Sequence, residues 1–398
     1  MTLLVCLALL VLALPAIVTC GYLLFLTLLS AANRTPARST RTTCFDVIVP
    51  AHNEAVGIQR TVASLLALDW PRECFRVLVV ADNCTDDTAA LARAAGAHVL
   101  ERFDDTLRGK GYALRHAMQF SAADGRAAAV VVIDADAEVS VNLLEAFASR
   151  IERGEQAIQV HYGILNPQAS WRTRLITIAK GAFHIVRSRA RERLGLSCGI
   201  RGNGWCVTHA LLGRHPYQAF SLTEDLEFGI DLGLAGVRVA YADEAHSDAE
   251  MVTDKTVAAK QRSRWEAGRF QMVRTRTWPL LRAGLARPSA LCFELGLDLI
   301  VLPLSYVVIN VLLLIAVAAL ASHWLPTLLP WLWIGLGCGS ALLLHVLRGW
   351  QVSGIGWRGA FDLARVPIFL AWKLLLLFRR QKPQGWVRTE REKSRAGP

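Results

Sequence analysis

The stretch VVVIDADAEVS, Val130–Ser140, decides the predicted fold, because an apolar run ends in paired acids. The run Val130–Ile133 predicts a buried strand, and Asp134 and Asp136 follow it with one alanine between them. Alternate residues of an extended chain share a face, so both carboxylates can lean toward one point past the strand. Such charges repel unless a cation lies between them. The alternative is a strand-to-helix turn in which one aspartate caps the next helix.

Strands and helices alternate before this stretch. The predicted strands are Phe45–Val49, Val77–Val80 and Val130–Ile133, and the predicted helices cover 55–68, 87–95 and 112–122. This alternation is typical of a parallel, doubly wound α/β sheet. Ligands bind such sheets at the carboxyl ends of the strands. Those ends read PAHNE (Pro50–Glu54), ADN (Ala81–Asn83) and DAD (Asp134–Asp136), which together predict a nucleotide pocket.

Several nucleotide and hydrolase motifs are absent from the sequence. Gly109-Lys110-Gly111 lacks the hydroxyl partner and the preceding strand of a P-loop, and no G-x-G-x-x-G follows the first strand. The zincin and nucleophile-elbow patterns are also missing. These absences exclude P-loop ATPases, dinucleotide-dependent redox enzymes, metalloproteases and lipases. The nine cysteines are scattered and form no C-x-x-C pair. We therefore expect them to be reduced, structural residues.

The composition predicts a membrane protein. Of 398 residues 53% are hydrophobic, and the mean hydropathy is +0.33, too apolar for a purely soluble chain. Three segments are long and apolar enough to span a bilayer: Leu3–Leu29, Leu299–Leu320 and Pro330–Leu347. The first is too long for a signal-peptide core and lacks a basic start, so we expect an uncleaved anchor.

Basic residues predict the orientation. Arg34, Arg38 and Arg41 follow the first span, which places the following domain in the cytoplasm. Asp362, Arg365 and Lys373 share one side of the apolar helix 361–378, so we expect this helix to lie in the interface rather than to span. The net charge is +11, and two basic stretches cover 172–193 and 386–391. We expect these stretches to bind anionic lipids or to close over the site rather than to bind nucleic acid.

The expected domains follow from these segments. They are a transmembrane anchor over 1–32, a cytosolic α/β domain over 41–285, two transmembrane helices over 290–350, and an interfacial helix with a basic cytosolic tail over 359–398.

Two later motifs carry candidate chemistry. SLTEDLEFG places Glu224 and Asp225 at the start of a helical stretch, although Ser221 and Glu224 also have capping-box spacing. KQRSRWEAG places Gln261, Arg264 and Trp265 on one helical face, where an amide, a guanidinium and an indole share a surface.

In this order, PAHNE, ADNCTDDT, DAD, RGNGWC, TED and QRSRW resemble the membrane-bound family 2 glycosyltransferases with the GT-A fold, over about Phe45 to Phe270. The cellulose-, chitin- and hyaluronan-synthase-like branch is the most similar. The resemblance implies a GT-A-type sheet flanked by transmembrane and interfacial helices. It also implies a donor site in which Asp82 reads the uracil edge of a UDP-sugar and Lys110 lies near the diphosphate. The residues that would frame the nucleotide are Pro50, His52, Asn53, Glu54 and Asp134.

The same resemblance implies that Asp134 and Asp136 hold Mg²⁺ or Mn²⁺, with Asp136 as the direct ligand. Asp225 would be the general base, kept ionised by the helix N-terminus, and Glu224 would orient it or contact the acceptor. On the acceptor and diphosphate side would lie Gly202, Asn203, Trp205, Gln261, Arg264 and Trp265. For Trp205, core packing is the alternative.

The expected protein is an inverting, metal-dependent glycosyltransferase in a bacterial inner membrane, with its catalytic domain in the cytoplasm. It would move a sugar from a UDP-sugar to a lipid-linked or nascent polysaccharide acceptor, with an export partner or a second copy of the chain as further candidates. The alternatives are a processive polysaccharide synthase, a catalytically silent sugar-nucleotide-binding scaffold and a nucleotidyltransferase. The donor sugar, the acceptor and the linkage stay open.

Overall fold

The computed structural model describes residues 2–251 and 255–367, without the side chains of residues 2, 255–260 and 262. The described chain divides into two compact units. The first contains residues 2–31, 168–194 and 298–367, and the second contains the rest. The sequence predicts 168–194 within the domain 41–285, whereas the structure groups it with the apolar helices. The second unit is therefore discontinuous in sequence.

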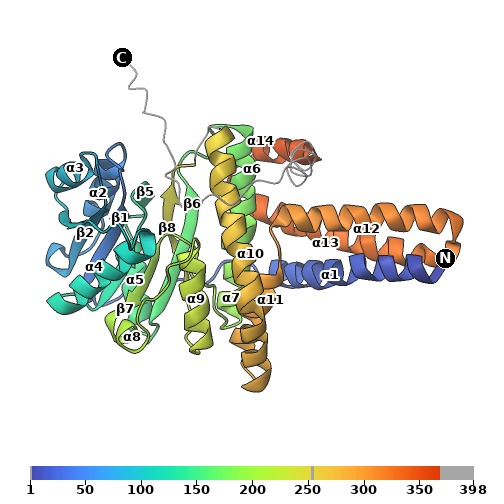
Figure 1. Ribbon diagram of the computed structural model, residues 1–398, viewed down its shortest axis with the longest axis horizontal. Helices are drawn as coiled ribbons and strands as arrows, with labels where there is room; N and C mark the ends of the chain where they lie inside the picture. The colour runs from blue at the N-terminus through green and yellow to red at the C-terminus, as the bar shows by residue number, and fades with distance from the viewer. Residues whose placement is uncertain (1, 252–254, 368–398) are drawn as a thin grey trace, which may run out of the picture. The chain divides into compact units, whose positions relative to one another are not determined.

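The second unit is built on an eight-stranded sheet with the order β3-β2-β1-β4-β7-β6-β8-β5 (Figure 1). The strands are β1 (Phe45–Ala51), β2 (Phe75–Asp82), β3 (His98–Arg102), β4 (Ala129–Val132), β5 (Ala137–Val139), β6 (Ala157–Ile164), β7 (Trp205–Thr208) and β8 (Ala240–Ala249). β3, β2, β1 and β4 run parallel, as predicted. β7 is antiparallel to both β4 and β6, β8 is parallel to β6, and β5 is antiparallel to β8. The sheet is thus mixed beyond β4.

Alternating side chains of the central strands feed two separate cores, which confirms the doubly wound α/β class. Val47 and Val131 pack on one face, whereas Ile48 and Val130 pack on the other. The first face is covered by α2 (Ile58–Leu66), α3 (Thr88–Ala94) and α5 (Leu143–Ile151). The second is covered by α4 (Lys110–Asp124), α8 (His209–Arg214) and α9 (Glu224–Leu234). Both faces are apolar, so the central strands are near-continuous hydrophobic runs.

Two further helices complete this unit, α10 (Lys255–Ala286) and most of α11 (Ala290–Ile300). Within the described residues, short 3₁₀ turns cover Arg72–Cys74, Pro326–Leu328 and Leu363–Arg365.

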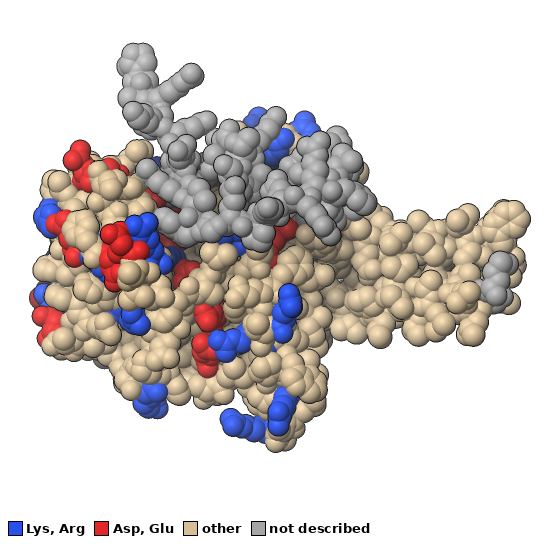
Figure 2. Space-filling view, viewed as in Figure 1, with Lys and Arg blue, Asp and Glu red and all other residues tan. Residues whose placement is uncertain are grey.

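The first unit contains three helices long and apolar enough to cross a membrane, over Leu3–Leu28, Leu304–Trp324 and Pro326–Ser353. They correspond to α1 (Thr2–Leu28), α12 (Leu304–Trp324) and α13 (Leu329–Ser353) with the turn before it. The three predicted spans are therefore confirmed as candidates. The second begins at Leu304 rather than at Leu299, because Pro303 precedes it and ends the preceding backbone segment. The face of these three helices that Figure 2 shows carries no charged residue.

The segment 168–194 folds as α6 (Trp171–Lys180), a π-helical stretch (Gly181–Val186) and α7 (Arg187–Arg193). It packs closely on α13, because a Cβ on Gly181 would lie 2.5 Å from the carbonyl oxygen of Gly349. Arg187 and Arg191 are buried and pair with Asp298. This part of the basic stretch is therefore not a solvated surface.

The short helix α14 (Trp357–Asp362) also belongs to the first unit. Asp362 is 4% exposed and pairs with Arg174 at 2.5 Å and with Arg365 at 2.8 Å. The charges predicted to form an exposed stripe thus include one buried acid. Most of the predicted interfacial helix 361–378, and the basic tail after it, lie outside the described residues.

Candidate active site

The first two strand ends are tied together by polar contacts. The ring nitrogen Nδ1 of His52 lies 2.7 Å from the backbone oxygen of Asp82. The side-chain oxygen of Asn53 accepts a 2.7 Å hydrogen bond from the backbone of Thr85, and the amide of Glu54 donates to Thr88. The structure therefore brings the predicted nucleotide-framing residues after β1 and β2 together at one edge of the sheet.

Left-handed backbone explains why asparagine follows each of these strands. Asn53 has a φ of 56° and Asn83 a φ of 51°, a conformation that asparagine tolerates better than most residues. Pro50 lies just before, as the penultimate residue of β1.

Asp82 has a partner that the sequence does not reveal. Its carboxylate is 2.6 Å from Arg102, which also lies 3.0 Å from Asp104. Asp82 is 6% exposed, so this pair is largely withdrawn from water. Arg102 ends β3 and pairs in register with Asp82, which explains their contact. The role of Asp82 in reading a base stays a prediction.

Asp134 lies at the centre of the charged cluster. The ammonium of Lys110, the first residue of α4, is 2.7 Å from its carboxylate and 3.4 Å from that of Glu224. Lys110 also donates to the backbone oxygen of Gly202 at 3.3 Å. Burial disfavours the charge on Lys110, but Asp134 and Glu224 raise its pKa well above the ordinary value. Residues from three distant motifs therefore meet around one ammonium group.

Glu224 and Asp225 open α9 as predicted, but the capping box does not form. The residue before the helix is Thr223, whose side chain makes no capping hydrogen bond, and the hydroxyl of Ser221 is buried without a partner among the described residues. Glu224 instead turns to Lys110. The functional interpretation of this motif is therefore favoured over the capping interpretation.

Asp225 is poised to exchange a proton near neutral pH. Burial is the main cause that raises its pKa to about 7, and the charge of Glu224 raises it further. The opposite charge of Lys110 lowers it, as does the helix-terminal backbone amide of Leu226. The sequence predicts that the helix N-terminus keeps Asp225 ionised. In the structure this effect is outweighed, because the desolvation of the carboxylate is larger.

The RGNG segment lies directly beside these acids. Gly202 has a φ of +87°, and a Cβ placed there would lie 3.6 Å from the carboxylate of Asp225 and 3.5 Å from the ring of Tyr162. Asn203 is fully buried and accepts a 3.0 Å hydrogen bond from the backbone amide of Asp134. It supports the DAD turn rather than lining an open surface.

The prediction that Trp205 lines the acceptor side is wrong. Its ring is 1% exposed and belongs to the core on the second face of the sheet. It stacks with Tyr217 at 6.3 Å and packs against Phe228 at 5.8 Å between ring centroids. The core-packing alternative is therefore correct for Trp205, because the first side chain of β7 points into the core on the second face of the sheet.

The QxxRW residues lie on α10, as their spacing predicts. Gln261 and Arg264 are partly buried, and Trp265 is 39% exposed. The same face continues to Gly268, where a Cβ would come 2.4 Å from the methyl group of Thr223. Because Thr223 directly precedes Glu224, this close approach places the QxxRW turn of α10 at the start of α9.

Ion pairs hold the next part of α10 against α9. Arg276 lies 3.4 Å from Glu227 and 3.1 Å from Asp231. Glu227 in turn accepts hydrogen bonds from the backbone amides of Phe220 and Ser221. The loop before TED, helix α9 and helix α10 therefore form one connected assembly.

The donor set fits a hard divalent cation. Asp134 and Asp136 offer carboxylate oxygens, which Mg²⁺ and Mn²⁺ prefer. No group of three or more histidine, cysteine or acidic residues able to hold a metal exists among residues 2–251 and 255–367. Mg²⁺ is commonly bound by one or two carboxylates together with substrate phosphates and water. The pair therefore suits a metal that arrives with a diphosphate.

Sequence reasoning missed three residues of this site. Arg102 and Gln159 are isolated polar residues in strands, a pattern without a motif. Tyr162 lies on β6, and burial with the nearby charges of Asp134 and Asp136 raises its pKa well above the ordinary value. No sequence signal pointed to it, because its neighbours in the site come from distant segments.

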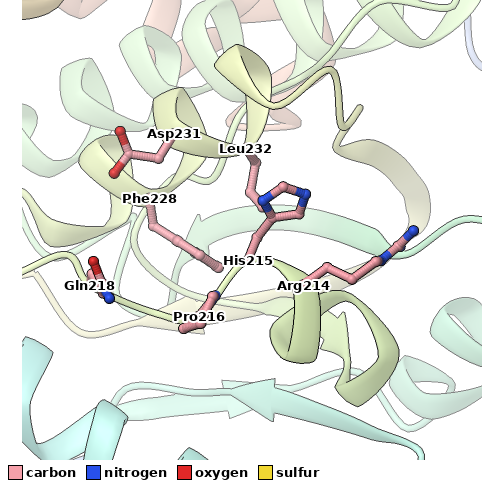
Figure 3. A pocket seen from close by; sticks show the side chains of 7 residues that line it. All are labelled: Arg214, His215, Pro216, Gln218, Phe228, Asp231 and Leu232. Carbon is pink, nitrogen blue, oxygen red and sulfur yellow. The ribbon is translucent and has the colours of Figure 1, made fainter.

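A separate cavity lies between the end of α8 and α9 (Figure 3). Its lining residues are Arg214, His215, Pro216, Gln218, Phe228, Asp231 and Leu232. None of the predicted site residues lines it, so it is distinct from the charged cluster around Lys110.

Comparison with known proteins identifies the class. Residues 46–205 match the model of glycosyl transferase family 2, and residues 129–378, more than half of the chain, match that of glycosyl transferase family group 2. The chain therefore belongs to the family 2 glycosyltransferases, and its mixed α/β sheet is the type expected for GT-A enzymes.

Individual relatives are more distant. A beta-monoglucosyldiacylglycerol synthase of Synechocystis is 30% identical over 238 residues, which cover 56% of this chain and 47% of the relative. The UDP-forming cellulose synthase catalytic subunit of Pseudomonas fluorescens is 26% identical, with 62% of this chain and 34% of the relative covered. The chain thus spans half or less of these relatives.

Among solved structures, a mannosyltransferase from Pyrobaculum calidifontis in complex with GDP-Man and Mn²⁺ is 16% identical. The match covers 85% of this chain and 98% of that one, with a TM-score of 0.49.

Proposed function

We propose that this membrane protein transfers a sugar from a UDP-sugar to a membrane-associated acceptor, with inversion at the anomeric carbon. The observation that carries the proposal is the meeting of DAD, TED and Lys110 in one cluster, with Asp225 at a pKa of about 7. A general base works best when its pKa lies near the working pH. Family membership supports the same reaction.

The chain's own residues divide the work. Asp225 takes the proton of an acceptor hydroxyl as its oxygen attacks the anomeric carbon. The bond from that carbon to the diphosphate breaks, a β-glycosidic bond forms, and UDP leaves. Lys110 supplies positive charge beside the diphosphate, and Arg264 adds a charge-assisted contact on the acceptor side. Trp265, partly exposed, offers a platform for a sugar ring.

Asp134 and Asp136 would hold Mg²⁺ or Mn²⁺. A bound divalent cation would neutralise the charge that develops on the departing diphosphate. Asp82 and the loop after β1 lie at one edge of the sheet and would bind the uridine end there.

A lipid-linked or nascent polysaccharide acceptor is the favoured one. The relatives are named as a glucosyldiacylglycerol synthase and a cellulose synthase. Three candidate spans in the described chain are few to enclose a polysaccharide channel, since its polar lumen must be shielded from lipid. Processive synthesis therefore stays the second candidate and would need a partner or another copy of the chain.

The test is a UDP-release screen over a panel of UDP-sugars in native membranes with Mn²⁺ or Mg²⁺, followed by mass analysis of the product. We expect release that is lost on chelation with EDTA and in Asp225→Asn. A product one sugar longer than its acceptor excludes processivity. Release of pyrophosphate instead of UDP would identify a nucleotidyltransferase. Absence of hydrolysis and transfer, with an unchanged cellular phenotype for Asp225→Asn, would leave the silent-scaffold alternative.

A further inference from the structure

The DAD turn is held from one side by a buried hydroxyl on α2. The side chain of Thr61 donates a 2.9 Å hydrogen bond to the backbone oxygen of Ala135, the residue between the two aspartates. Thr61 is fully buried and belongs to none of the motifs. A hydroxyl buried away from water destabilises the fold unless it is bonded, so this contact fixes the Ala135 peptide relative to α2.

The same turn is held from the other side by a buried amide. The side-chain oxygen of Asn203 accepts from the backbone amide of Asp134 at 3.0 Å. Its side-chain nitrogen is buried without a partner among the described residues. Leaving such a buried polar group unsatisfied destabilises the fold. An apolar side chain at position 203 would leave no such nitrogen unsatisfied. The reason for asparagine here is therefore its side-chain oxygen, which holds the backbone amide of Asp134.

Gln159 on β6 fixes the segment that carries Asn203. Its side-chain nitrogen lies 2.7 Å from the backbone oxygen of Asn203 and 3.0 Å from that of Gly204. Its side-chain oxygen accepts from the backbone amide of Arg201 at 2.9 Å. Gln159 is 1% exposed. One side chain therefore holds both ends of the segment 201–204.

This segment also contacts the rest of the site. The backbone oxygen of Gly202 accepts from Lys110, and Gly202 lies beside Asp225. A shift of the segment would therefore move the supports of Asp134, Lys110 and Asp225 together. Thr61, Asn203 and Gln159 form a continuous set of supports that never reach the open site themselves.

We infer that Thr61, Asn203 and Gln159 are positioning residues that set the direction of the Asp134 and Asp136 carboxylates for a divalent cation and a diphosphate. The inference rests on the proposed function for the identity of that ligand. Removing an outer support of a metal ligand typically weakens metal binding by about 10- to 100-fold. We expect a loss of this order when either the Thr61 or the Gln159 contact is removed.

The experiment compares Thr61→Val, Thr61→Ser and Gln159→Leu with the wild-type protein in detergent. Thr61→Val keeps the branched shape and removes only the hydroxyl, whereas Thr61→Ser keeps the hydroxyl. Thr208→Val is the matched control, because it makes the same chemical change at a buried residue whose hydroxyl instead caps α8. The readouts are Mn²⁺ binding by electron paramagnetic resonance, UDP binding with Mn²⁺ by calorimetry, and thermal unfolding.

We expect Thr61→Val and Gln159→Leu to weaken Mn²⁺ binding in the presence of UDP by at least about tenfold. Thr61→Ser should bind like the wild type, and so should Thr208→Val despite its lost cap. Wild-type affinity in Thr61→Val, or an equal loss in Thr208→Val, would overturn the inference.

These outcomes are distinct from those that test the proposed function. A wild-type protein that binds Mn²⁺ and UDP but transfers no sugar contradicts the function and leaves the positioning result standing. A wild-type protein that binds neither contradicts both.

Discussion

Asp225 combines a position at the centre of the site with an environment that opposes its charge. Its folded pKa of about 7 lies above the ordinary value of a free carboxyl, about 3.9. Folding therefore favours the protonated form, and ionisation of Asp225 destabilises the fold increasingly as the pH rises from its ordinary pKa to about 7. We predict that Asp225→Asn raises the melting temperature at pH 8 by at least about 2 °C while lowering kcat by about 100-fold or more. Scanning calorimetry in EDTA and UDP release check this. A purely structural Asp225 would give a lower melting temperature instead.

The same pKa predicts the pH dependence of the reaction. The base must be ionised to take a proton, so kcat/KM should fall below about pH 7 and level off above it. The profile should be measured from pH 5.5 to 9 at saturating metal, with Asp231→Asn as a control. Asp231 lies on the same helix, and burial also raises its pKa, but it faces Arg276. A flat profile for the wild type would exclude Asp225 as the base.

Which site residues the sequence could predict depends on how each one is positioned. Asp82 ends one parallel strand and Asp134 follows another, so their proximity can be predicted from the rule that the carboxyl ends of parallel strands meet at one edge of the sheet. Arg102 and Gln159 act through cross-strand register and a folded loop, which no local pattern encodes. The prediction for Trp205 is wrong, because a motif position does not reveal which face of the sheet receives a ring.

At the scale of elements, the contact of α10 with α9 depends on one glycine. A Cβ at Gly268 would overlap the Thr223 methyl at 2.4 Å, so Gly268→Ala must displace the QxxRW turn from Glu224 and Asp225. Because a displacement of about 1 Å costs on the order of 100-fold in rate, we predict a kcat loss of that order. UDP release at saturating donor measures it.

A double variant and a control make this prediction specific. Thr223→Ser removes the overlapping methyl, so adding it to Gly268→Ala should restore most of the rate. Gly213→Ala on α8 meets no atom within 4 Å and should leave the rate unchanged. If the double variant stays as slow as Gly268→Ala, the overlap is not the cause.

The elements themselves were predictable where both faces of a strand are buried. Val77–Val80 and Val130–Ile133 are continuous apolar runs. The bounds of β2 and β4 agree with these runs to within a few residues. The sequence predicts none of β3, β5, β6, β7 and β8. HVLER of β3 and AEV of β5 are short and mostly partly buried, so they lack a continuous apolar run. The antiparallel half of the sheet depends on chain reversals around 168–194, whose membership in the first unit is a tertiary property.

At the scale of the whole molecule, the arginines after the first span predict that the second unit faces the cytoplasm. The partly buried Cys44, Cys74 and Cys84 all belong to this unit. We predict that a membrane-impermeant maleimide modifies these three cysteines in inverted vesicles and in detergent but not in intact cells. Mass spectrometry of the labelled peptides identifies the sites. Modification of these cysteines in intact cells would place the unit outside.

The insertion of 168–194 between β6 and β7 imposes an order on biosynthesis. Its partner surface around Gly349 is made more than 150 residues after the insertion itself, so this segment leaves the ribosome long before α13 exists to receive it. β7 cannot join β4 and β6 until the excursion has been looped out. A nascent chain that stalls before the last apolar helix would therefore expose the continuous helical segment Trp171–Arg193 without its partner surface, where chaperones and proteases could bind it.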